Sequence, residues 1–179
     1  MSTRGNYVFA EYPYKKDDDG DYRLDPEQIV NLKKGISNET EVIKNGYKIY
    51  VHWDNYPSGA LPRLLQFLEL KGAKARAGDL PYLAAWFVTY NCCLNSHWEL
   101  EPCDIAAKND FTGIGLETKL NDWCDYTYVI VPDITIKENG YIKKQNGFRI
   151  FIFDYKFDFI EEIHSTDDIE EYETAEWWY

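Results

Sequence analysis

The fold is set by residues 47–70, which read YKIYVHWDNYPSGALPRLLQFLEL. The first seven of these residues have the aromatic and β-branched bias of a strand, and turn-forming residues follow them. Leucines then recur mainly three or four positions apart, with Gly72 placed as a C-cap. We therefore expect a strand, a tight turn and an amphipathic helix over about residues 60–71.

Further elements are expected on the N-terminal side of this stretch. Residues 40–43 and 47–53 flank Asn45-Gly46, a dipeptide that tolerates the positive φ angles of a tight turn. This pattern predicts a β-hairpin. A first strand is predicted at residues 7–12, and a short helix at residues 26–34 has the capping residues of a helix start and a glycine at its end.

The C-terminal side adds a second long helix and a group of strands. The helix is predicted at residues 80–94, and residues 95–122 lack periodicity and are expected to be mostly loop. The strands are predicted at residues 126–131, 134–137, 141–144 and 148–155. The turn residues between them imply antiparallel pairing. We expect one α+β domain over residues 1–179, a mainly antiparallel sheet with two or three helices packed on one face.

Composition restricts the function classes. The net charge of −12 disfavours direct nucleic-acid binding, which depends on Lys and Arg displacing counterions, and fits docking onto a basic protein surface. No apolar run is long enough for a membrane span, and the first residues lack the apolar core of a signal peptide. We therefore expect a cytoplasmic protein whose four cysteines are reduced.

The charge is concentrated in an acidic C-terminal segment, residues 157–179. This segment holds nine Asp or Glu residues and no Lys or Arg. Clustered carboxylates steer a protein toward a basic surface, and aromatic side chains anchor it after docking. The predicted binding residues here are Glu170, Glu171, Glu173, Glu176, Trp177 and Trp178. The alternative is an acidic helix that packs on its own domain.

His52 and Asp54 form the first candidate site outside that segment. If the strand continues through them, both side chains lie on one face, and a carboxylate can then orient an imidazole for general-base chemistry. The structural interpretation, which we favour, is that Asp54 caps the turn while His52, Trp53 and Tyr56 pack around it.

Ser2 and Arg4 form a second candidate site. If Met1 is removed, Ser2 becomes an N-terminal residue that can act as a nucleophile, with its own amino group as the base. The start Ser-Thr-Arg is similar to the Cys-Thr-Arg start of some N-terminal-nucleophile amidohydrolases. The alternative is that Arg4 simply pairs with an acidic residue.

Two clusters resemble metal sites but lack the required spacing. Cys93, His97 and Cys103 have the donor types of zinc without the usual pairs of closely spaced cysteines. Residues 17–21 have the composition of a calcium loop, but Pro26 stands where the bidentate glutamate is needed. We therefore predict no metal ion and no cofactor.

Residues 1–4, MSTR, and residues 50–59, YVHWDNYPSG, resemble small uncharacterised proteins common in phages and prophages. Those proteins have similar openings and a central motif like HWDGYP. Asn55 stands where they have glycine, and asparagine also tolerates the left-handed conformation, so we expect the turn to survive. The resemblance implies a mobile-element origin, in which small acidic proteins often counter host defence by binding a protein or a signalling nucleotide.

The expected function is therefore that of a non-enzymatic anti-defence protein, like an anti-CRISPR inhibitor, which mimics nucleic-acid charge and binds a basic surface of a host protein. The alternative is a small-molecule or nucleotide-binding pocket, or an N-terminal-nucleophile hydrolase. That alternative uses Ser2 and Arg4 together with His52, Asp54 and Tyr56.

Overall fold

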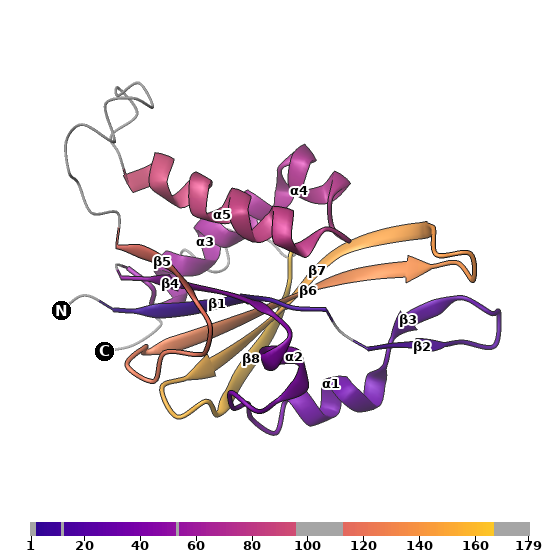
Figure 1. Cartoon of the computed structure of the whole chain (residues 1–179), viewed down its shortest axis with the longest axis horizontal. Coiled ribbons are helices and arrows are strands. Elements are labelled where there is room, and N and C mark those ends of the chain that lie inside the picture. Colours follow the sequence, from indigo (N-terminus) through magenta and orange to yellow (C-terminus); the bar gives the residue numbers. More distant parts are fainter. Residues whose placement is uncertain (1–2, 12, 53, 96–112, 167–179) are drawn as a thin grey trace.

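The computed structural model describes residues 3–11, 13–52, 54–95 and 113–166 (Figure 1). Within these ranges one sheet contains eight strands: β1 (Gly5–Phe9), β2 (Tyr14–Lys16), β3 (Tyr22–Leu24), β4 (Tyr47–Val51), β5 (Ile114–Glu117), β6 (Tyr126–Ile136), β7 (Ile142–Asp154) and β8 (Phe159–His164). The same ranges contain five helices: α1 (Pro26–Leu32), α2 (Glu41–Lys44), α3 (Pro57–Glu69), α4 (Lys71–Ala75) and α5 (Leu80–Asn95). None of these helices combines the length and the apolar character needed to cross a membrane.

Strand β6 organises the sheet because its two halves have different neighbours. Along one edge it pairs with β7 in antiparallel orientation, and β7 pairs in turn with β8. Along the other edge it pairs first with β1, in parallel, and then at Ile136 with β3. Strands β4 and β5 continue the sheet beyond β1, and β2 continues it beyond β3. Figure 1 shows β2, β3 and the far halves of β6 and β7 extending past the helices.

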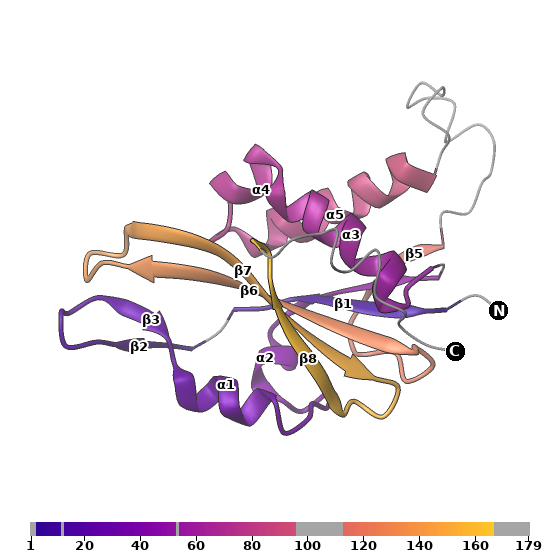
Figure 2. The same cartoon turned by 180° about the vertical axis from the view of Figure 1, so that it is seen from behind.

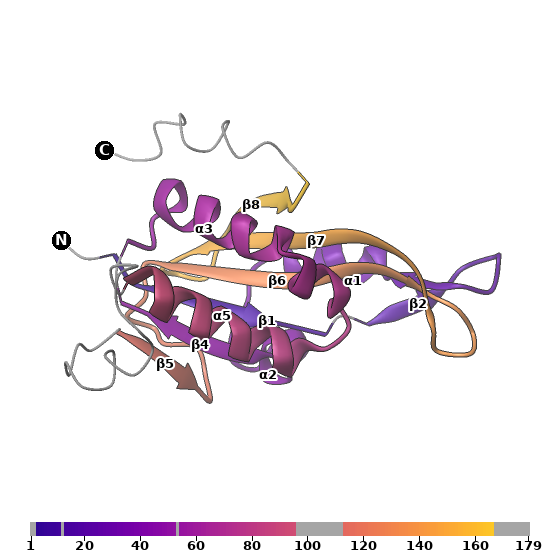
Figure 3. The same cartoon turned by 90° about the horizontal axis from the view of Figure 1, so that it is seen from above.

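Helices cover both faces of the sheet, as Figures 1 and 2 show. Alternation along β1 explains this, because Tyr7 and Phe9 point into the core beneath α3, α4 and α5, while Val8 points into the core beneath α1 and α2. Figure 3 shows α3 and α5 lying over the same face. The predicted α+β class, with three helices on one face of a mainly antiparallel sheet, is confirmed, and α1 and α2 cover the opposite face.

The predicted hairpin around Asn45-Gly46 is wrong. Residues 41–44 form the short helix α2, which buries the adjacent side chains of Val42 and Ile43 together; a strand would have sent them to opposite faces. Glycine is needed at position 46 because the backbone there lies close to β1. A Cβ atom at Gly46 would lie 2.5 Å from Val8 Cγ1. Strand β4 therefore pairs with β1 and β5.

Two of the three turns predicted between the last strands are also wrong, and only residues 138–140 form a turn. Strand β6 continues through Pro132 because its pairing partner on β7, Phe148, does not need an N–H from it. The N–H and C=O of Phe148 instead form hydrogen bonds with Ser165. Pro132 therefore faces the gap between β1 and β3, where no N–H is needed. At Gly147 the positive φ of 114° serves a β-bulge within β7.

The other predicted elements are largely confirmed. The first strand appears as β1, and the helices predicted at residues 26–34, 60–71 and 80–94 appear as α1, α3 and α5. Helix α3 begins three residues earlier than predicted, with Pro57 in its first turn. Within residues 113–122, predicted to be loop, Ile114–Glu117 form β5 at an edge of the sheet.

Candidate functional site

The structure brings together the two stretches predicted to form a small-molecule site. The backbone N–H of Asn55 and its side-chain Nδ2 both donate to the carbonyl oxygen of Thr3, at 3.3 and 3.1 Å. The start of β1 therefore lies directly beside the turn that follows β4. We call this place the Asn55 corner: Thr3, Arg4, Tyr7, residues 50–52 and 54–56, and Tyr128. Ser2 and Trp53 lie outside the described residues.

Asn55 is the structural centre of this corner, and its side chain is fully buried. Its Nδ2 also donates to the Val51 carbonyl at 2.9 Å, and its Oδ1 accepts from the Tyr7 hydroxyl at 2.7 Å. The Tyr128 hydroxyl donates to the Asn55 carbonyl at 2.7 Å. Burial raises the pKa of both tyrosine hydroxyls, so they remain neutral donors. Sequence reasoning treated Asn55 only as a turn residue.

Asp54, not Asn55, adopts the left-handed conformation, with a φ of 50°. The regular alternation of the strand ends before this residue, so the premise that His52 and Asp54 share a strand face is wrong. The expected Asx-type cap is not seen, because no described residue donates a hydrogen bond to the Asp54 carboxylate; Tyr56 is the N-cap of α3, and the Asp54 carbonyl accepts from Arg63 Nη2 at 2.7 Å. The Asp54 carboxylate is exposed, and Tyr56 is 40% exposed.

His52 has a partner that sequence reasoning missed. Its Nδ1 lies 2.6 Å from the hydroxyl of Tyr50, two residues earlier on β4. Its backbone N–H donates to the Gly113 carbonyl at 2.9 Å, which fixes the start of β5. Tyr50 could have been found from the two-residue period of a strand, which places it beside His52.

Arg4 gives the corner its cationic character. Its backbone N–H donates to Asp125 Oδ2 at 2.8 Å, and its carbonyl accepts from the Asp125 N–H at 2.9 Å. Its guanidinium opposes the rise in pKa that burial causes in Tyr50. The Nε atom of Arg4 is buried and has no hydrogen-bond partner among the described residues. An unsatisfied cationic donor favours an anionic ligand.

The thiol of Cys124 lies close enough to Arg4 for the two to interact electrostatically. Burial raises its pKa to about 12, and the Asp125 carboxylate adds to the rise, while Arg4 opposes it. The thiol is therefore protonated at neutral pH and is a poor nucleophile. Cys124 packs as a small apolar side chain.

The acidic turn at residues 17–21 is held by protein cations. Asp17 forms an ion pair with Arg23 at 2.7 Å, and Asp21 forms one with Lys143. The side chains of Cys93, His97 and Cys103 lie outside the described part of the chain. Within that part, no three His, Cys, Asp or Glu side chains are grouped so that they could hold a metal ion.

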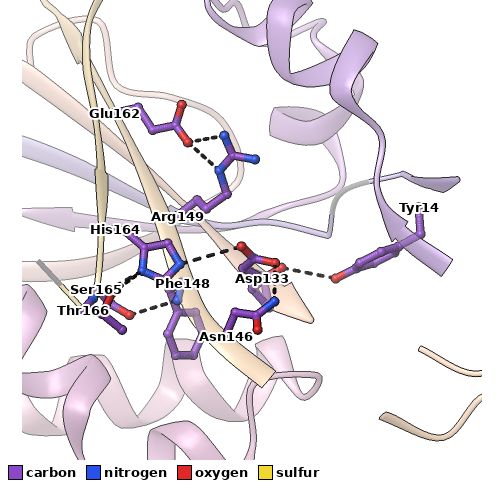
Figure 4. Close-up of polar contacts among 10 residues, drawn as sticks. Tyr14, Asp133, Asn146, Phe148, Arg149, Glu162, His164, Ser165 and Thr166 are labelled. Atoms are coloured by element: carbon purple, nitrogen blue, oxygen red, sulfur yellow. Dashed lines mark hydrogen bonds and ion pairs between the residues drawn. The ribbon is translucent and has the colours of Figure 1, made fainter. Parts of the chain in front are cut away.

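A second polar group, not predicted from the sequence, lies where β7 bulges against β6 and β8 ends (Figure 4). We call it the His164 cluster: Asp133, Asn146, His164, Ser165 and Thr166. His164 Nδ1 lies 2.7 Å from Thr166 Oγ1, and its Nε2 lies 3.7 Å from Asp133 Oδ2. Ser165 exchanges hydrogen bonds with the backbone of Phe148. The cluster therefore fastens the end of β8 to β7.

This attachment divides the acidic segment predicted over residues 157–179. Its first part contains β8, whose Glu162 pairs with Arg149 and, at 2.6 Å, with Lys33. The six predicted binding residues Glu170, Glu171, Glu173, Glu176, Trp177 and Trp178 lie outside the described residues. Their role stays a prediction.

Comparisons with known proteins add no constraint to either place. The likeness of residues 1–4 and 50–59 to phage and prophage proteins therefore stays a prediction. Searches against protein-family models, curated proteins and solved structures found no match.

Proposed function

We propose that this chain is a non-enzymatic protein of mobile-element origin that inhibits a host factor by docking on its basic surface. The observation that carries the proposal is the distribution of charge. Residues 96–112 and 167–179 together contain ten of the 31 acidic side chains and one of the 19 basic ones. The remaining residues, with 21 acidic and 18 basic side chains, are close to neutral.

Several acids of the described residues form ion pairs within the fold. Asp17, Asp21 and Glu162 each face a Lys or Arg partner, as does Glu138 in its ion pair with Lys16. Internal pairs of this kind cancel at long range, whereas a run of acids with no base among them produces a field that attracts a basic partner. The six acids at residues 167–176 are the strongest source of such a field.

Aromatic side chains follow these acids. Trp177, Trp178 and Tyr179 are residue types that often carry the binding energy of protein interfaces. Carboxylates would then govern the rate of association, while the aromatic side chains would slow dissociation. This division of roles fits an inhibitor that competes with a nucleic acid for one surface.

The test is a pull-down from host extract with three baits: the full chain, residues 1–166, and a full chain with the six acids at 167–176 changed to Asn or Gln. Cutting after Thr166 keeps Ser165, which fastens β8 to β7. We expect the full chain alone to retain a basic partner, which double-stranded DNA and added salt should displace. Equal retention by all three baits would overturn the proposal.

A second candidate function is favoured by the unsatisfied Nε of Arg4. Because this atom is buried, an anionic small molecule such as a nucleotide could take a hydrogen bond from it only after the groups that cover it move, with Tyr50 and His52 nearby. Calorimetric titration of a panel of cyclic and linear nucleotides should then show binding by the full chain and by residues 1–166, and loss with Arg4→Gln. Binding by none of the panel would exclude this nucleotide function.

The alternative N-terminal-nucleophile hydrolase function requires a further condition. Its nucleophile is Ser2, which must carry the free amino group after Met1 is removed. Intact-mass measurement decides this point, because a chain that retains Met1 has no such nucleophile.

A further inference from the structure

An apolar groove lies among the three helices that cover one face of the sheet. It is bounded by the end of α3, by α4 and by the first half of α5. Its volume is about 360 Å³. Buried Phe67 and Leu83 contribute its deepest atoms, while Leu70 and Trp86, which are 41% and 48% exposed, form its walls. Exposed large apolar side chains that converge on one groove mark a binding surface.

The rim of this groove is basic on the α4 side. Lys71 lines it and makes no ion pair with any described residue, whereas Lys74 pairs with Glu69. Arg76 pairs with Asp79 at 3.1 Å, and its guanidinium lies 4.7 Å from the centre of the Tyr82 ring, which itself packs 5.8 Å from the Trp86 ring. A ligand that matches this surface combines aromatic side chains with carboxylates.

We propose that Trp177 and Trp178 of the chain's own C-terminal residues occupy this groove. The preceding residues, 167–176, contain six acids and no base, which complements the unpaired charge of Lys71. The proposal concerns the isolated chain and does not depend on a host partner.

The reach is sufficient. Ile163 of β8 belongs to the same core cluster as Phe67 and Leu83, so β8 ends on the side of the sheet that carries the groove. Figure 2 shows the end of β8 rising toward the layer of α3 and α5. The eleven residue-to-residue steps from Thr166 to Trp177 span up to roughly 38 Å when extended, about twice the ~20 Å length of α3.

Tethering makes a weak contact effective. A short flexible connection gives an effective concentration on the order of 1 mM, so an affinity of about 0.1 mM would keep the groove roughly nine-tenths occupied. Trp86 would then be shielded from reagents for most of the time.

Hydroxyl-radical footprinting of the full chain, read by mass spectrometry, tests this. We expect oxidation of Trp86 to be up to about tenfold slower in the natural chain than in the double variant Trp177→Ser/Trp178→Ser. Trp123, which is 74% exposed and does not line the groove, is the internal control and should react equally in both. A ratio below about twofold for Trp86 would overturn the proposal.

Two further measurements identify the occupant. Protection should be independent of protein concentration, and protection that disappears on dilution would overturn the intramolecular assignment in favour of a second copy. Lys71→Glu should weaken protection by about twofold, as expected for an exposed ion pair. Lys137→Glu, an equal charge change at an exposed turn, should not, and equal losses in the two variants would overturn the role of Lys71.

Discussion

The Asn55 corner and the His164 cluster lie at two places along β6, and both combine a histidine, a carboxylate or amide, and a hydroxyl. At the corner, Asn55 is fully buried; its side-chain amide binds Tyr7, Thr3 and Val51, and its backbone carbonyl binds Tyr128. At the cluster, the His164 and Asp133 side chains are each more than a quarter exposed, and His164 Nε2 lies 3.7 Å from Asp133 Oδ2. Water can replace the contacts of the His164 imidazole but cannot reach those of Asn55.

The difference teaches that burial, more than residue type, decides what such a group does. An unmade hydrogen bond costs about 1–3 kcal/mol when the group is buried, whereas an exposed ion pair contributes about 0–1 kcal/mol. The Asn55 corner should therefore dominate stability, and the His164 cluster should act locally on the end of β8. Four changes test this contrast.

The largest effect is expected for Asn55→Ala. This change removes three side-chain hydrogen bonds and leaves the Tyr7 hydroxyl buried without its acceptor. We expect the free energy of unfolding to fall by about 3 kcal/mol or more. Urea denaturation followed by circular dichroism measures it. Asn139→Ala, at an exposed turn, is the control and should change little; a loss below about 1 kcal/mol at Asn55 would break the contrast.

Gly147→Ala should have the next largest effect, because two penalties add at the bulge beside the His164 cluster. The φ of 114° disfavours alanine, and its Cβ would lie 2.6 Å from Ser165 Oγ. We expect a loss of about 2–3 kcal/mol by urea denaturation. Gly140 is the matched control, since its φ is 83° and its Cβ would meet nothing within 4 Å, so Gly140→Ala should cost only about 1 kcal/mol. Equal losses would show that the contact with Ser165 is unimportant.

Alkaline pH should lower the free energy of unfolding, because the buried Cys124 thiol and the buried tyrosine hydroxyls of the Asn55 corner lose their protons more easily in the unfolded chain. The pKa of Cys124 rises from 9.0 to about 12 on folding, so the unfolded chain loses this proton first. Stability is therefore complete below pH 9 and declines between pH 9 and 12, by up to about 1.4 kcal/mol per pH unit for this thiol. Cys124→Ala should flatten the decline between pH 9 and 10, before Tyr7 and Tyr128 contribute. An unchanged slope would show that the thiol is not shielded.

The sequence predicted the α+β class and the long helices because leucine spacing and capping residues report local structure directly. It failed at Asn45-Gly46 and Asn146-Gly147, since this dipeptide signals a conformation or a close approach but not which strands pair. Asn55 was missed for a related reason. Its importance arises from Tyr7 and Tyr128, which are distant in the sequence and meet it only after β1 and β6 pair.

The smallest effect is expected for His164→Ala. The imidazole contacts Asp133 and Thr166 at a partly exposed site, so its loss should reduce the free energy of unfolding by less than about 1 kcal/mol. Local behaviour should still respond, because His164 helps to fasten the end of β8. Hydrogen exchange read by mass spectrometry should show faster exchange in residues 159–166 and no change in residues 47–57. Arg149→Ala is the matched comparison, because it removes an ion pair with Glu162, which lies on β8 like His164. If His164→Ala instead lowered stability as much as Asn55→Ala, burial would not be what separates the two places.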